Sequence, residues 1–227
     1  MIDASLDPEV YVELAEQLGW KIARVLDTHV HADHLSRSRG LTELVGATLH
    51  MPEGLPVSYP YSGLRDGEAL EVGAARLEVI RTPGHTPEST SYLLNGRALF
   101  TGDTLFIESV GRPDLGAAPE EAREKVRSLH ASLRRLLEMD PETLVLPGHT
   151  SSPVPFNGEP VVGTLADVRE SVPLLRESKE AFVEQITVSA PPPPENHEHI
   201  VELNRAGELP EGNTTELEAG ANRCAVG

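Results

Sequence analysis

One stretch of eight residues limits what this chain can fold into more than any other: Thr28 to Leu35, read T-H-V-H-A-D-H-L. It holds the densest run of metal-capable side chains in the sequence, namely His29, His31, Asp33 and His34. Imidazole and carboxylate groups are the ligands that zinc and ferrous iron select, and four of them on one short turn can share a cation without long loop closures. The sequence therefore predicts a metal site here.

The flanking residues place this run between a strand and a helix. Residues 23–27 are typical of a short buried strand, and residues 35–45 carry apolar side chains at helical spacing before Gly46, a C-terminal stop signal. In layered α/β proteins, sites form where strands end, because the sheet fixes the backbone while the loop directs side chains outward. We therefore expect an α/β fold with the cluster at a strand end. Chance clustering of histidines on a solvated turn is the alternative interpretation.

Two later turns argue against chance. Residues 82–87, T-P-G-H-T-P, and residues 147–149, P-G-H, each follow an apolar strand. Proline and glycine fix tight turns, which can hold a ligand without a flexible loop. We expect His85 and His149 to be such ligands. Asp103 follows a third strand in the sequence T-G-D-T, after a hairpin signalled by Asn95-Gly96.

The remaining pattern predicts alternating strands and helices. The expected helices are 8–18, with Val10, Leu14 and Leu18 on a face that needs a sheet to cover it, 119–139, and 165–186 interrupted at Pro173. The expected strands are 47–50, 68–72, 76–81, 89–94, 98–101 and 143–146. We expect one domain over residues 1–190. A proline-rich linker and C-terminal tail, 191–227, would pack on or extend it, with a short helix at 196–204 and poor order from Gly207 onward.

Composition excludes several classes of protein. The 227 residues carry a formal net charge of −17 and no run of Lys or Arg, which argues against nucleic acid and against anionic membrane as partners. The single cysteine, Cys224, excludes an internal disulfide framework and a cysteine-rich zinc site. No stretch approaches the roughly twenty apolar residues of a membrane span, and the first residues lack the features of a signal peptide. We expect a cytoplasmic protein.

Seven strand-end groups now stand in a fixed order: H-x-H-x-D-H, then a histidine, an aspartate in G-D-T, and a histidine in P-G-H. This order resembles the metallo-β-lactamase fold superfamily. The resemblance implies a four-layer αββα sandwich with metals at one edge of its two sheets. That family carries opening strands before the first helix, which this sequence lacks, so the resemblance implies either that Met1 is an internal start or that the sheet is shortened. An uncovered sheet edge would favour a homodimer.

Three local features resemble one branch of that superfamily, the persulfide dioxygenases. They are T-H-V-H-A-D-H, T-G-D-T-L-F followed by G-R-P-D-L at 111–115, and N-R-C-A-V at 222–226. The resemblance implies one Fe(2+) per chain, held by His29, His85 and Asp103. These would be the facial triad of a non-heme iron oxygenase, which leaves positions for substrate, O2 and water.

The same resemblance implies substrates and further roles. The substrates would be O2 and a small thiol persulfide, such as glutathione persulfide, and the products sulfite and the thiol. The metal would be surrounded by four outer groups that orient ligands and handle protons: His31, Asp33, His34 and His149. Asp33 and His34 would act in catalysis, and Arg112 would contact a substrate carboxylate.

Two other interpretations stay open. In a dinuclear hydrolase, two Zn(2+) per chain would use the same seven residues, bridged by Asp103, to cleave thioesters such as hydroxyacylglutathione, or lactones. The C-terminal part lacks the basic helical substrate domain expected of a glyoxalase II-like thioester hydrolase. The other interpretation is a non-catalytic metal-binding module, which the presence of every ligand argues against.

Overall fold

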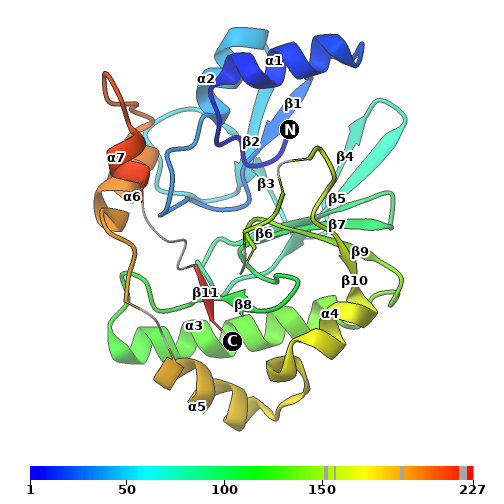
Figure 1. The fold of residues 1–227 in the computed structure, drawn as a ribbon, viewed down its shortest axis with the longest axis vertical. Helices are drawn as coiled ribbons and strands as arrows, with labels where there is room; N and C mark the ends of the chain where they lie inside the picture. The colour runs from blue at the N-terminus through cyan, green and yellow to red at the C-terminus, as the bar shows by residue number, and fades with distance from the viewer. Residues whose placement is uncertain (151–152, 156, 190–191, 220–223, 227) are drawn as a thin grey trace. The chain divides into compact units, whose positions relative to one another are not determined.

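Two sheets, each with its own helices and its own apolar core, organise the chain (Figure 1). The computed structural model describes residues 1–150, 153–155, 157–189, 192–219 and 224–226. The first unit comprises Met1–Arg65 and Pro194–Ala221, and the second comprises Asp66–Pro193 and Asn222–Gly227. The chain changes unit close to the predicted boundary at residue 191, but its return to the first unit was not predicted. A single domain over residues 1–190 stays a prediction.

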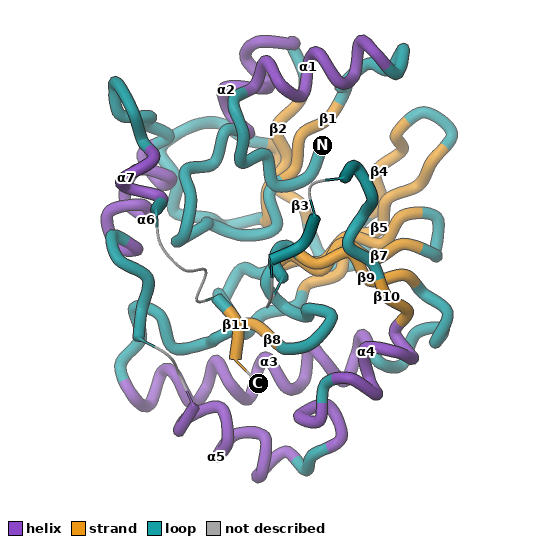
Figure 2. Tube along the Cα trace, viewed as in Figure 1, coloured by secondary structure: helices purple, strands orange, loops and turns teal. Residues whose placement is uncertain are grey.

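The first unit is built on a parallel sheet of order β1-β2-β3. Its strands are β1 (Arg24–Leu26), β2 (Thr48–Pro52) and β3 (Ser62–Leu64), and its helices are α1 (Pro8–Gln17), α2 (Ser38–Val45), α6 (His197–Ala206) and α7 (Thr215–Glu218). Between β1 and α2, residues 27–37 form neither helix nor strand (Figure 2). This loop carries the histidine cluster, as the sequence predicted.

Helix α1 forms where expected but buries a different face. Val10, Leu14 and Leu18 stay 47–50% exposed, whereas Tyr11 and Val12 contact the core of the first unit. Because successive residues are about 100° apart, Val12 lies about 160° around the helix from Val10 and Leu14, and Tyr11 lies between the two faces. The predicted covering of the Val10, Leu14 and Leu18 face is therefore wrong.

The second unit contains a six-stranded sheet of order β10-β9-β7-β6-β5-β4. Its strands are β4 (Ala69–Val72), β5 (Ala75–Arg81), β6 (Thr90–Leu94), β7 (Ala98–Gly102), β9 (Leu144–Pro147) and β10 (Gly163–Thr164). A small two-stranded sheet pairs β8 (Val110–Gly111) with β11 (Ala225–Val226). The helices are α3 (Pro119–Leu136), α4 (Leu165–Ser171) and α5 (Lys179–Ser189), with a 3-10 turn, η1, at Pro173–Arg176.

The turn chemistry of this sheet sets its strand directions. Asn95 and Gly96 both have positive φ, 52° and 66°, as a type I′ hairpin turn between β6 and β7 requires. The strands β5, β6 and β7 are successively antiparallel, and β7 is parallel to β9. β5, β7 and β9 therefore run in one direction and end at the same edge of the sheet. Helices α3 and α5 pack on one another along the second unit (Figure 1).

Most predicted elements are confirmed, and the exceptions are short. The sequence did not predict β3, β8, β10 or β11, which have two or three residues each. Poor order from Gly207 onward is wrong for the described part of the tail, which contains α7 and β11. Within the described residues, no helix combines the length and apolarity needed to cross a bilayer.

Candidate metal centre

The common edge of β5, β7 and β9 gathers three of the predicted ligands in the second unit. His85 follows β5, Asp103 follows β7 and His149 follows β9. The Asp103 carboxylate lies between the two rings: its Oδ2 is 3.6 Å from His85 Nε2, and its Oδ1 is 3.3 Å from His149 Nε2. The adjacency follows from topology, since neighbouring parallel strands end side by side.

Three glycines let the backbone approach this carboxylate and its neighbours. A Cβ on Gly84, where φ is 151°, would lie 2.4 Å from Leu129 in α3. A Cβ on Gly111 would lie 1.7 Å from the Asp103 carbonyl oxygen, and one on Gly148 would lie 2.7 Å from Asp103 Oδ1. The glycines of T-P-G-H and P-G-H thus serve close packing as well as turn formation.

A backbone carbonyl fixes the orientation of His85. Its Nδ1 lies 2.7 Å from the carbonyl oxygen of Arg112, which can only accept, so Nδ1 carries the hydrogen. In the neutral ring, Nε2 then has the lone pair, and this nitrogen faces Asp103 Oδ2. Two electron-rich atoms face one another stably only with a proton or a cation between them. The pair therefore fits a metal ion by its donor chemistry.

Arg112 itself is buried and engaged. Its guanidinium pairs with Asp114 through Nε and Nη2, at 2.9 and 2.7 Å, and Nη1 donates to the carbonyl of Pro192 at 3.0 Å. Burial alone would raise the pKa of the Asp114 carboxyl, but Arg112 lowers it below its usual value. A substrate carboxylate would have to compete with Asp114 for this guanidinium, and a substrate-binding role for Arg112 stays a prediction.

The small sheet beside this edge involves the predicted N-R-C-A-V segment. The Arg112 N–H donates to the carbonyl of Cys224 at 2.8 Å, and β8 pairs with β11 directly beyond it. Cys224 is buried and forms no disulfide. Asn222 and Arg223 lie outside the described residues.

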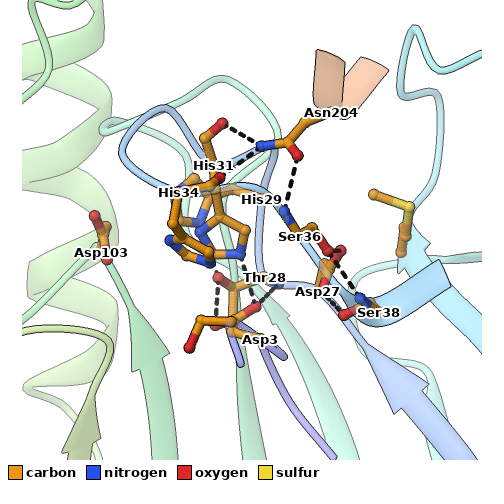
Figure 3. Close-up of polar contacts among 12 residues, drawn as sticks. Asp3, Asp27, Thr28, His29, His31, His34, Ser36, Ser38, Asp103 and Asn204 are labelled. Atoms are coloured by element: carbon orange, nitrogen blue, oxygen red, sulfur yellow. Dashed lines mark hydrogen bonds and ion pairs between the residues drawn. The ribbon is translucent and has the colours of Figure 1, made fainter. Parts of the chain in front are cut away.

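In the first unit, Asp3 organises the histidine loop (Figure 3). Its carboxylate accepts the Thr28 N–H at 2.7 Å and the Thr28 hydroxyl at 2.9 Å. Because the single hydroxyl hydrogen goes to Asp3, the hydroxyl oxygen must accept from His29 Nδ1, 2.8 Å away. In the neutral ring, the lone pair of His29 is therefore on Nε2, the same tautomer as that of His85 in the second unit.

The other two imidazoles have ring nitrogens that fit a cation. Among the described residues, the buried atoms His31 Nδ1 and His34 Nε2 have no hydrogen-bond partner. Ligand atoms of His31, Asp33 and His34 all lie within 4.8 Å of one another, and Asp33 Oδ1 is 3.2 Å from His34 Nδ1. The ring centroid of His31 lies 4.3 Å from that of His29 and 4.1 Å from that of His34. Buried ring nitrogens without partners are costly, and a bound metal would satisfy them.

Carboxylates control the charge of this loop. Burial would lower the pKa of His31, but attraction to Asp3, 3.3 Å from its Nε2, raises the pKa to about 10. Burial raises the pKa of Asp27, which accepts hydrogen bonds from the hydroxyls of Ser36 and Ser38. A metal that binds His31 through Nδ1 therefore replaces a proton that Asp3 now stabilises.

The structure thus brings together four predicted groups in the first unit and three in the second. The first set is His29, His31, Asp33 and His34, and the second is His85, Asp103 and His149. Convergence of both sets on one cation stays a prediction. Sequence reasoning missed Asp3, whose only signal is its place between two apolar residues, Ile2 and Ala4.

The chain belongs to the metallo-β-lactamase superfamily. The model of that superfamily, described as "Metallo-beta-lactamase superfamily", matches residues 1–149. This match takes in all seven predicted ligands and ends at His149.

Relatives within the superfamily include both hydrolases and a persulfide dioxygenase. A hydroxyacylglutathione hydrolase from Acidiphilium cryptum is 33% identical over 63% of this chain, and the chain spans only 56% of that protein. A probable metallo-hydrolase from Burkholderia pseudomallei is 30% identical over 86% of this chain and 76% of its own length. The mitochondrial persulfide dioxygenase ETHE1 from Bos taurus is 28% identical over 85% of this chain and 72% of its own length.

A solved structure also supports membership of the metallo-β-lactamase superfamily. The crystal structure of ETHE1 from Myxococcus xanthus is 32% identical, covers 91% of this chain and 87% of its own, and has a TM-score of 0.79. The metallo-β-lactamase fold predicted from the seven groups is therefore confirmed.

Proposed function

We propose that this protein is an iron-dependent persulfide dioxygenase that oxidises glutathione persulfide, or a related thiol persulfide, with O2. The observation that carries the proposal is the likeness to ETHE1 of Myxococcus xanthus, which at 32% identity extends over 91% of this chain and so includes its C-terminal part. The hydroxyacylglutathione hydrolase of Acidiphilium cryptum matches only 63% of the chain.

In the proposed site, His29, His85 and Asp103 hold one ferrous ion. Both histidines would bind through Nε2, because the Thr28 hydroxyl and the Arg112 carbonyl occupy their Nδ1 hydrogens. Iron there would supply open coordination positions and electron-transfer chemistry. The remaining work falls to the chain: it orients the two rings and excludes bulk water from buried ligands.

The overall reaction balances without an outside reductant. One thiol persulfide, one O2 and one water give one thiol, one sulfite and two protons. The persulfide loses four electrons in total, which reduce the dioxygen; the terminal sulfur is oxidised, and the sulfur–sulfur bond breaks with its electron pair on the inner sulfur, which takes up a proton. Asp33 and His34 form a carboxylate–imidazole pair at 3.2 Å, and we assign proton transfer to that pair.

A dinuclear zinc hydrolase of thioesters such as hydroxyacylglutathione is the second candidate. Asp103 directs one oxygen toward His85 and the other toward His149, the arrangement that a carboxylate bridging two metals would use. The hydrolase relatives favour this candidate as well.

Metal analysis of protein purified without added metal, with two assays run in parallel, tests the proposal. One iron per chain, with O2 uptake and sulfite release from glutathione persulfide, supports the dioxygenase. Two zincs, with hydrolysis of hydroxyacylglutathione and no O2 uptake, refute it.

Matched variants make the choice sharper. In the dioxygenase, His34→Ala should keep one iron per chain while it lowers kcat, because His34 handles protons. In the hydrolase, the same change should remove one of two zincs. His199→Ala, on an exposed face of α6, is the control and should change neither metal content nor rate.

A further inference from the structure

Residues from the C-terminal part of the chain hold the backbone of the histidine loop. Asn204 in α6 is 6% exposed and lies with its amide against the loop (Figure 3). Its Nδ2 donates to the carbonyl oxygens of His31 and His34, both at 2.9 Å. Its Oδ1 accepts the N–H of Ser36 at 2.8 Å.

Glu218, at the end of α7, makes a second attachment. Its Oε1 accepts the N–H of Leu35 at 2.7 Å. The Arg37 guanidinium pairs with both Glu218 oxygens, Nη1 with Oε1 at 2.8 Å and Nη2 with Oε2 at 3.0 Å. The Thr214 hydroxyl donates to Oε2 at 2.9 Å, which fixes the carboxylate further.

These hydrogen bonds satisfy backbone polar groups of the histidine loop. Residues 27–37 lack helix and strand, so their backbone polar groups must find partners elsewhere. Four backbone groups between residues 31 and 36, two carbonyls and two N–H groups, bond to only two side chains, which lie 168 to 183 positions later in the sequence. The carbonyls of His31 and His34 bracket Asp33, so the amide of Asn204 sets the backbone from which three metal-capable side chains project.

We propose that Asn204 and Glu218 are positioning residues that set the metal affinity of the histidine loop. Without them the loop would populate conformations in which its metal-capable side chains, His29, His31, Asp33 and His34, are no longer held in place. Apparent metal affinity falls in proportion to the fraction of molecules that are binding-competent. The inference rests on a metal bound at this loop, either through His29 as in the proposed dioxygenase or through His31, Asp33 and His34 as well, as in the hydrolase.

The test measures metal binding to the full-length, metal-free protein by competition with a chromophoric chelator, using Co(2+) and Zn(2+) as probes. Asn204→Leu keeps the shape of the side chain and removes all three hydrogen bonds. We expect its dissociation constant to rise by about 10- to 100-fold, the usual effect of losing a partner that orients metal ligands. The absorption bands of bound Co(2+) should change as well, because the ligand geometry changes.

Two further variants keep the test decisive if Asn204→Leu does not fold. Asn204→Asp keeps the acceptor for Ser36 and loses both donors. Its added negative charge would by itself strengthen cation binding. Weaker binding would therefore result from the loss of the two hydrogen bonds that Asn204 donates to the loop. Glu218→Gln keeps an acceptor for Leu35 but loses the ion pair, so a smaller rise is expected.

The control is Glu202→Gln on α6, whose side chain is 80% exposed. It should bind both metals as the wild type does. If the Asn204 variants melt at lower temperature yet bind Co(2+) and Zn(2+) with unchanged affinity and spectrum, Asn204 only stabilises the fold and the proposal is overturned. Equal weakening in the control would overturn it too.

Discussion

Gly148→Ala offers the sharpest probe of the Asp103 carboxylate. The φ of Gly148 is not in the positive range that excludes alanine, so the backbone accepts the change. The new Cβ would lie 2.7 Å from Asp103 Oδ1, and the carboxylate must move by about 0.6 Å to reach an ordinary close carbon–oxygen contact of roughly 3.3 Å. The new Cβ would also lie 3.1 and 3.2 Å from the backbone carbon and oxygen of Gly102, which need a smaller adjustment, so the largest displacement falls on the Asp103 carboxylate.

The expected effect is large on function and small on folding. Active groups must be held within roughly 0.5 Å of their productive positions, and a misplacement of about 1 Å can cost about 100-fold in rate. We expect metal affinity and metal-dependent activity to fall by about 10- to 100-fold. Alanine also restricts the unfolded chain, which contributes about 0.4–1 kcal/mol of stability and offsets part of the strain. The free energy of unfolding should change by less than about 1 kcal/mol.

Two other glycines calibrate the measurement. Gly40→Ala, inside α2, meets nothing closer than Pro8 Cγ at 3.6 Å and should stabilise the protein by about 1 kcal/mol with no effect on metal binding. Gly111→Ala would place a Cβ 1.7 Å from the Asp103 carbonyl oxygen, which no rotamer change relieves, and should cost at least about 3 kcal/mol. Urea unfolding and chelator competition on all three variants give the comparison. Wild-type metal affinity in a folded Gly148→Ala protein would show that Asp103 is not a ligand.

Three further outcomes follow from contacts in the two units. Thr28→Val should weaken metal binding because His29 Nδ1 loses its acceptor, whereas Thr28→Ser should not; equal affinities in a chelator titration would refute this. Leu129→Ala, in the core of the second unit, should lower the free energy of urea unfolding by about 2–5 kcal/mol, and a loss below 1 kcal/mol would contradict the packing. Burial would raise the pKa of Glu218, but hydrogen bonds from Arg37 and the loop lower it below its usual 4.5. A depressed carboxyl stabilises the fold above the unfolded pKa and loses that effect as pH falls through the folded value, so the stability gap between wild type and Glu218→Gln should shrink on acidification. A gap that is constant in urea titrations from neutral to acidic pH would argue against the ion pair.

Local patterns in the sequence predicted most elements because their causes are local. The Asn95-Gly96 turn, the Gly46 helix end and the strand before Asp103 each depend on residues within a few positions. We also expected Asp103 and His149 to lie at one edge of the sheet, and they do. Neighbouring parallel strands end side by side, so the turns that follow them lie close together.

The contacts that the sequence did not predict join residues that are far apart along the chain. Asp3 reaches Thr28 across 25 positions, and Asn204 reaches Ser36 across 168, with no periodicity or motif to signal either contact. Composition alone made the tail look poorly ordered, although Glu218 is held there by Arg37. The outer face of α1 shows the converse error, because Val10 and its neighbours have the spacing of a buried stripe without being buried.

One candidate metal ligand in each unit, His29 or His85, is oriented by a hydrogen bond from its Nδ1 to an oxygen atom. The two acceptor oxygens differ in how strongly they polarise the ring. In both histidines, an oxygen acceptor takes the Nδ1 hydrogen, so the lone pair of the neutral ring is on Nε2. For His85 the acceptor is a neutral backbone carbonyl, that of Arg112. For His29 it is the Thr28 hydroxyl, whose own hydrogen is drawn toward the Asp3 carboxylate, so the chain of hydrogen bonds ends in a negative charge. Hydrogen bonds that end on a carboxylate raise the basicity of the imidazole, so His29 should be the stronger electron donor of the two. That asymmetry predicts that His29 binds a metal more strongly than His85 does.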